Sequence, residues 1–308
     1  MTITTLRTGA TALLIALLGA GTPVARKLNV VATTPDLAAL ATAIGGDAVD
    51  VKALAKPTED PHFVDAKPSH IVTLNRADVL IEGGAELELG WLPPLLESAR
   101  NNKIAVGAPG RISVAQGVTL LEVPSTFDRS QGDVHALGNP HFLIDPVNVK
   151  LIIRQIAEHF AQVDPVNAAL YKENLQKFGT TLDAKLADWQ KQLAPYGGAK
   201  IVTYHRDFVY LAERFNLVIV ETLEPKPGIA PSPAHLAKVI STMRAEKARL
   251  ILVQPFQNRK TAETVARQVD GVVLDIPQQP GAITNTDTYF DLMDYIVRTL
   301  ATAFAETK

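Results

Sequence analysis

The sequence predicts an α/β fold with two similar lobes, each a mostly parallel four-stranded sheet flanked by helices, joined by one long rigid helix. Three observations predict it. Short apolar runs rich in Val and Ile alternate with helical patterns along the 308-residue chain. Four such runs fall in each half, and a helical stretch of some thirty residues separates the halves. Continuous apolar runs are typical of strands buried on both faces of a parallel sheet, and strand–helix alternation is typical of α/β proteins.

The expected strands occupy residues 29–35, 49–57, 77–84 and 103–109 in the first half and 199–205, 216–222, 249–255 and 271–277 in the second. Helical patterns lie between them at 36–46, 68–77, 89–101, 207–215, 233–248 and 260–269.

The helical stretch between the halves runs from 145–163 into 164–196. Asp164 and Pro165 suit a helix N-cap and first helical position, and Pro195 and two glycines end the segment. A helix of this length would be about 45 Å long, which is longer than a small lobe is wide. We therefore expect an N-terminal lobe at 26–163, a linker helix at 164–196 and a C-terminal lobe at 197–308.

Residues 1–25 have a different composition from the rest of the chain. They contain one Arg, no acidic residue, an apolar run of nine residues and a small-residue end. The run is too short to span a bilayer, which takes about 20 apolar residues, and the pattern is that of a cleaved secretory signal peptide. We expect cleavage near Ala25, with Ala20 as the alternative position, and a periplasmic location.

The remaining composition excludes several classes of function. The net charge of −2 and the absence of basic runs give no indication of nucleic acid or an anionic membrane surface as partner. The chain has no cysteine, which excludes thiolate metal sites, thiol catalysis and a lipid-anchor cysteine. The expectation is a soluble exported protein, monomeric, with a large core.

Four polar residues fall where open α/β sheets bind ligands, at the carboxyl ends of strands or in the loops that follow. His205 and Asp275 end strands of the second half, His62 follows the second strand, and His141 lies in the connection leaving the first lobe. His62 and His141 each stand in a Pro-His-Phe triplet. Imidazole and carboxylate ligands in a set of four suit Zn²⁺ and neighbouring divalent metals, so the sequence predicts a metal site in the cleft between the lobes.

Alternatives exist for each residue. His70, His159 and His235 lie within helical patterns and are expected to be structural. His135, six residues before His141, is either a loop residue or an accessory metal ligand. Glu59 and Asp60 are expected to be solvated loop residues, and Asp275 could cap the following turn instead of binding metal.

Several ordered segments resemble one family. They are TTPDLAALATAIGGD, DPHFVDAKPSHIVTLNRADVLIEGG with ELGWLPPLL, GNPHFLIDPVNV, TYHRDFVYLAERFNL, PSPAHL and VVLDIP. Together they resemble the zinc/manganese (ZnuA-like) substrate-binding proteins of bacterial ABC importers over about residues 29–304. The resemblance implies two α/β lobes joined by a rigid helix and one metal ion bound by His62, His141, His205 and Asp275. It also implies an ABC permease with its ATPase as partner and no enzymatic activity.

The set of three imidazoles and one carboxylate favours Zn²⁺ as the transported ion over Mn²⁺. The His-rich loop of many zinc-binding members is absent, since His135 is the only histidine in residues 110–140. Two other functions stay open from the residues alone. One is a zinc hydrolase or hydratase with three histidine ligands and Asp275 as general base, and the other is an adhesin that contains a metal.

Overall fold

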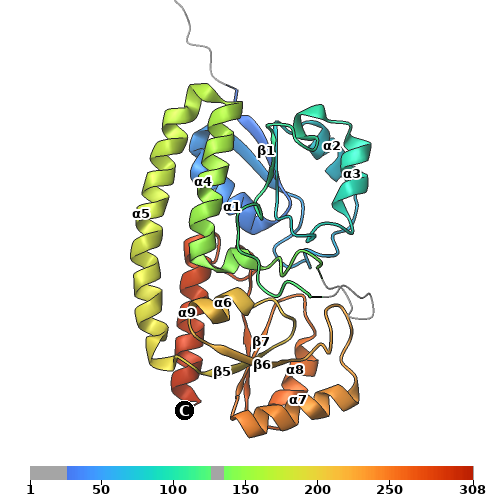
Figure 1. Ribbon diagram of the computed structural model, residues 1–308, viewed down its shortest axis with the longest axis vertical. Coiled ribbons are helices and arrows are strands. Elements are labelled where there is room, and N and C mark those ends of the chain that lie inside the picture. The colour runs from blue at the N-terminus through green and yellow to red at the C-terminus, as the bar shows by residue number, and fades with distance from the viewer. Residues whose placement is uncertain (1–25, 126–134, 308) are drawn as a thin grey trace, which may run out of the picture.

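The computed structural model describes residues 26–125 and 135–307 and contains two parallel four-stranded sheets in two lobes (Figure 1). The strand order is β2-β1-β3-β4 in the first sheet and β6-β5-β7-β8 in the second, so the two lobes share one topology. The strands are β1 (Leu28–Ala32), β2 (Val49–Ala53), β3 (Val79–Glu82), β4 (Arg111–Ser113), β5 (Lys200–Thr203), β6 (Val218–Thr222), β7 (Leu250–Val253) and β8 (Val272–Asp275). This confirms the predicted fold class. The expected signal peptide, residues 1–25, lies outside the described residues.

Helices cover both faces of each sheet. They are α1 (Pro35–Gly45), α2 (Pro68–Asn75), α3 (Leu92–Ala99), α4 (Pro146–Val163), α5 (Ala168–Leu193), α6 (Val209–Arg214), α7 (Pro233–Glu246), α8 (Arg259–Ala266) and α9 (Tyr289–Glu306). Of these, α9 was not expected from the sequence. None of the helices in the described ranges is both long enough and apolar enough to cross a bilayer.

The interior contains three clusters of buried apolar side chains, and neighbouring residues of one strand can belong to different clusters. In β1, Val30 packs into a large cluster shared by both lobes, while Val31 packs against α2 and α3 on the other face. In β5, Ile201 belongs to the shared cluster and Val202 packs against α7 and α8. Because successive side chains point to opposite faces of a sheet, the central strands β1, β3, β5 and β7 each contribute to two clusters, and this explains their apolar runs in the sequence.

The long helix α5 runs beside both lobes (Figure 1). It packs against α1 and α4 of the first lobe and against α9 of the second. Short 3-10 turns, Pro165–Asn167 and Ala194–Tyr196, precede and follow it, so the helical segment covers nearly the range expected. Asp164 does not cap the helix through its side chain. Its carboxylate accepts hydrogen bonds from Asn167 Nδ2 (2.7 Å) and Tyr171 Oη (2.6 Å) instead.

One expected strand was wrong. Residues 103–109 form a 3-10 turn and a loop, and the fourth strand of the first sheet is Arg111–Ser113. Val106 is 86% exposed, and Gly107 has a φ of +79°, which belongs to a turn and not a strand. The apolar letters of this stretch therefore do not mark burial, and a strand of three residues is too short to produce a recognisable pattern.

The shared cluster makes a prediction about α5. Leu182 is fully buried on this helix, so Leu182→Ala should lower the free energy of unfolding by about 2–5 kcal/mol through lost burial and a residual cavity. Val166, in the turn before α5, is 82% exposed, so Val166→Ala should change that free energy by less than about 0.5 kcal/mol. Urea denaturation of both variants tests this, and equal effects would contradict the proposed packing.

Candidate metal centre

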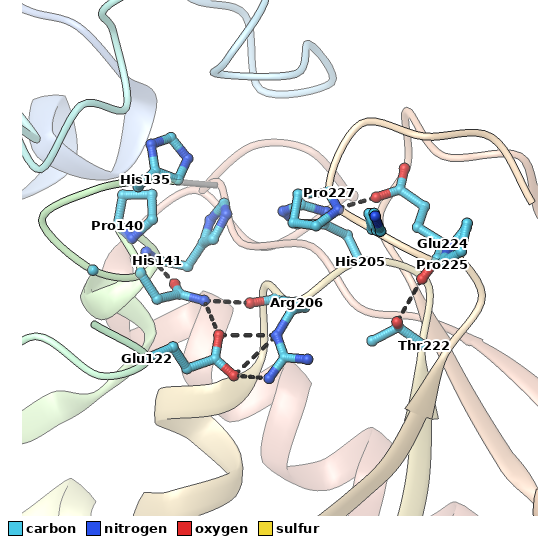
Figure 2. A pocket seen from close by; sticks show the side chains of 13 residues that line it. Glu122, His135, Pro140, His141, His205, Arg206, Thr222, Glu224, Pro225 and Pro227 are labelled. Atoms are coloured by element: carbon cyan, nitrogen blue, oxygen red, sulfur yellow. Dashed lines mark hydrogen bonds and ion pairs between the residues drawn. The ribbon is translucent and has the colours of Figure 1, made fainter. Parts of the chain in front are cut away.

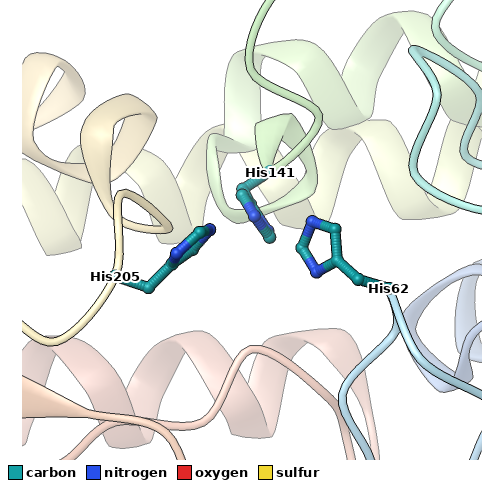
Figure 3. A group of neighbouring side chains, drawn as sticks. All are labelled: His62, His141 and His205. Carbon is teal, nitrogen blue, oxygen red and sulfur yellow. The ribbon is translucent and has the colours of Figure 1, made fainter. Parts of the chain in front are cut away.

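Three histidines from three separate segments meet between the lobes (Figure 3). His62 lies in the loop after β2, His141 directly precedes the 3-10 turn Phe142–Ile144, and His205 follows β5. One ring nitrogen of each lies within 4.8 Å of the others. The ring centroids are 5.1 Å apart for His62 and His141, 5.4 Å for His141 and His205, and 5.7 Å for His62 and His205. The three histidines that the sequence placed at strand ends and in neighbouring loops therefore lie together in the structure.

Two carboxylates orient two of these rings. Asp60 Oδ1 lies 2.9 Å from His62 Nδ1 and also accepts a hydrogen bond from the His62 backbone N–H at 3.0 Å. Glu224 Oε2 lies 2.8 Å from His205 Nδ1. A carboxylate on Nδ1 fixes the proton there and leaves Nε2 as the lone-pair donor, which is the usual support for a metal-binding histidine.

The free ring nitrogens have no protein partner. His62 Nε2 and His141 Nε2 are both buried and lack a hydrogen-bond partner. Buried polar atoms without partners are rare in folded proteins and call for an explanation such as a bound ion. The donor chemistry fits a divalent cation, because neutral imidazole is a good ligand for Zn²⁺, Fe²⁺ and related metals.

The electrostatic environment acts in opposite directions on two of these imidazoles. Burial, with the neighbouring histidines, lowers the pKa of His141 well below its usual value. Burial also disfavours the charged form of His205, but the hydrogen bond to Glu224 and the surrounding carboxylates outweigh it, so the pKa of His205 is raised. His205 is therefore the ring at which a proton competes most strongly with a metal ion.

Two open hollows flank the histidine group. One, of about 300 Å³, is lined by His135, His141, His205 and the Arg206–Glu122 ion pair (Figure 2). The other, of about 280 Å³, is lined by residues that include His62, His205 and Phe256. His141 and His205 line both, so an ion could reach the nitrogens from either side.

Asp275, the fourth expected ligand, is not part of the group. It ends β8 as expected, but its side chain is 46% exposed and its carboxylate pairs with Arg259 of α8. Its backbone carbonyl accepts a hydrogen bond from Tyr295 Oη of α9. The strand end was located correctly, but the direction of the side chain was not, because the charge of Arg259 attracts the carboxylate to the helix-covered face.

The remaining histidines divide as follows. His159 Nδ1 lies 2.9 Å from the Gln155 carbonyl oxygen within α4, and His235 Nε2 lies 2.9 Å from the Thr222 carbonyl oxygen, in keeping with structural roles. His70 lies on α2, outside the group. His135 is different, since its ring centroid lies 5.2 Å from that of His62.

Sequence reasoning missed the two orienting carboxylates. Asp60 was expected to be a solvated loop residue, and the two-residue spacing Asp60–His62 is the signal that could have identified it. Glu224 is 19 residues from His205 in the chain, and no local pattern joins them. The hydrogen-bond register of β5 and β6, with Glu224 N donating to the Tyr204 carbonyl, brings them together.

Comparison with known proteins agrees with this geometry. The family described as "Zinc-uptake complex component A periplasmic" matches residues 30–303. The iron-binding protein YfeA of Yersinia pestis is 26% identical over 287 residues, covering 92% of this chain and 88% of its own. The manganese ABC transporter substrate-binding lipoprotein PsaA of Streptococcus mitis is 23% identical over 295 residues, covering 91% and 90%.

Solved structures share the fold. The crystal structure of ZnuA matches with a TM-score of 0.76 at 24% identity and covers 90% of this chain and 99% of its own. An Mn-bound periplasmic metal binding protein from Candidatus Liberibacter asiaticus matches with a TM-score of 0.74 at 21% identity, covering 90% and 99%. On the family match over nearly the whole described chain, the protein belongs to the zinc-uptake complex component A family, the substrate-binding proteins of metal ABC transporters, which are not enzymes.

Proposed function

We propose that this protein binds Zn²⁺ in the periplasm through His62, His141 and His205 and delivers it to the permease and ATPase of an ABC importer. The observation that carries the proposal is the convergence of three imidazoles, two of them with Nδ1 held by a carboxylate and two with an orphaned buried Nε2. In such a set the ligands are already oriented for a divalent metal ion in the metal-free protein.

The donor set supports zinc over manganese. Relatives are named for iron and for manganese, so family membership alone does not select the ion. The group itself contains only imidazoles, since the carboxylate of Asp275 pairs with Arg259. Mn²⁺ prefers oxygen ligands, whereas imidazole suits Zn²⁺ and the later transition metals. The leader-like residues 1–25 and the absence of cysteine support export in soluble, unanchored form.

Metal titration of the protein, purified without a His-tag or chelator, tests the binding. We expect one Zn²⁺ per chain and weaker binding of Mn²⁺. His141→Ala removes a fully enclosed ligand and should weaken zinc binding by more than about 100-fold, beyond the usual effect of losing an outer-shell partner.

His159→Ala is the matched control, because this imidazole bonds only a carbonyl of its own helix. Its zinc affinity should equal that of the wild type. Protein that stays metal-free with added Zn²⁺, Mn²⁺ and Fe²⁺ would refute the proposed function.

Zinc affinity should fall as the pH is lowered, and His205 should determine where the fall begins. Ligation needs a neutral imidazole, and the pKa of His205 is raised, so protons compete at this ring at a higher pH than at an ordinary histidine. Glu224→Gln keeps a hydrogen-bond acceptor for Nδ1 but removes the negative charge. The pKa of His205, followed by NMR in the metal-free protein, should decrease, and the fall in zinc affinity should move to lower pH.

Glu97→Gln, at an exposed position of α3, provides the control for loss of one carboxylate. It should leave both the His205 titration and the affinity profile unchanged. An affinity that is constant from pH 8 to pH 5 would contradict a site built on imidazoles.

A further inference from the structure

The group of three histidines leaves one position of a tetrahedral zinc shell without a protein ligand. The obvious carboxylates are engaged elsewhere. Asp275 pairs with Arg259, while Asp60 and Glu224 hold the Nδ1 atoms of His62 and His205. The fourth position is filled either by water or by another group that lines the site.

Resting on the proposed function, we propose that His135 is the fourth protein ligand of the transported ion, in the place expected for Asp275. Its ring centroid lies 5.2 Å from that of His62. Its nitrogens do not join the group whose ligand atoms lie within 4.8 Å of one another, so ligation requires the His135 side chain to move closer. It lines the same hollow as His141 and His205 (Figure 2). In the described parts of the chain its imidazole makes no hydrogen bond that would have to be broken.

The short segment from His135 to His141 is fastened on both sides. The Ala136 N–H donates to Glu86 Oε2 (2.5 Å), and the Gly138 N–H closes a turn on the His135 carbonyl (3.2 Å). The Asn139 N–H donates to the Leu121 carbonyl (2.8 Å), and Asn139 Nδ2 donates to the Arg206 carbonyl (2.7 Å) in the other lobe. Gly138 has a φ of +119°, and a Cβ there would lie 2.8 Å from Leu120 Cβ, so this turn requires glycine.

The hydrogen bond from the Ala136 N–H to Glu86, next to His135, depends on an unusual stretch of backbone. Gly84, Ala85 and Glu86 have φ values of +76°, +50° and +67°, a left-handed run that is costly for the two residues with a Cβ. The buried Glu88 carboxylate holds the start of this run by accepting the N–H groups of Gly83 (2.7 Å) and Gly84 (3.1 Å). Such conformations persist where the surroundings enforce them and occur often at binding sites. Here the run carries the Glu86 carboxylate to the residue after His135.

A fourth imidazole has a consequence for selectivity. A shell of four nitrogens without oxygen favours Zn²⁺ over Mn²⁺ more strongly than a shell with one carboxylate. Replacing His135 by a carboxylate should therefore reduce the preference for zinc, whereas replacing Asp275 should not affect it.

The experiment compares the wild type, His135→Ala, His135→Asp, Asp275→Ala and the control His159→Ala, each checked for wild-type unfolding behaviour. Zn²⁺ and Mn²⁺ affinities are measured by competition with a chelator, and X-ray absorption of the zinc-loaded proteins counts the imidazoles bound to zinc. We expect four imidazoles in the wild type and three in His135→Ala, with zinc affinity reduced by about 10–100-fold. His135→Asp should lower the ratio of Zn²⁺ to Mn²⁺ affinity, and Asp275→Ala should match the control.

Three imidazoles in the wild type, with unchanged zinc affinity in His135→Ala and a loss in Asp275→Ala, would overturn the inference and leave the proposed function standing. A wild-type protein that binds none of these ions would overturn both. His135→Asp replaces a nitrogen ligand by an oxygen ligand at the same position. If the folded variant keeps the wild-type ratio of Zn²⁺ to Mn²⁺ affinity, the assignment of His135 as a ligand is wrong.

Discussion

The arrangement of the three histidines depends on a constraint far from them, the single core that both lobes share around α5. Tyr171, Leu182 and Trp189 of this helix are all fully buried in the cluster that also holds the inner faces of both sheets. Trp189 Nε1 donates to Asp294 Oδ1 of α9 at 2.7 Å, which ties the lower part of the helix to the second lobe. Because interiors are close-packed, the lobes cannot rotate freely about this helix without losing contacts. The three histidines come from both lobes, and this core fixes their separation.

Polar contacts across the cleft add to the same restraint close to the histidines. Arg214 of α6 makes two hydrogen bonds, of 2.7 and 2.9 Å, to the Asp145 carboxylate, which also caps α4. Tyr210 Oη donates to the Asn139 carbonyl (2.6 Å) two residues before His141. The segment that carries His141 is thus bonded to the lobe that carries His205. This frame restrains closure of the lobes more strongly than it restrains side chains and loops.

Similar residues in the sequence can have different roles in the fold. The two Pro-His-Phe triplets both place a histidine in the site, but Phe142 is fully buried while Phe63 is 63% exposed. Both triplets share a proline, whose own φ is fixed, directly before the histidine. The phenylalanines differ in burial, so the repeat is not a repeated packing unit, and what the triplets share is a histidine of the cluster.

The sequence by itself determined the fold class, seven of the eight strands and the three convergent histidines. These follow from local patterns and from the rule that ligands bind at the carboxyl ends of parallel strands. Only the tertiary structure decided what surrounds the imidazoles. Glu224 reaches His205 through the pairing of β5 with β6, Arg259 draws Asp275 away, and Glu86 fastens the backbone beside His135. Strand ends are readable from periodicity, but side-chain directions there depend on partners distant in the chain, which no local pattern encodes.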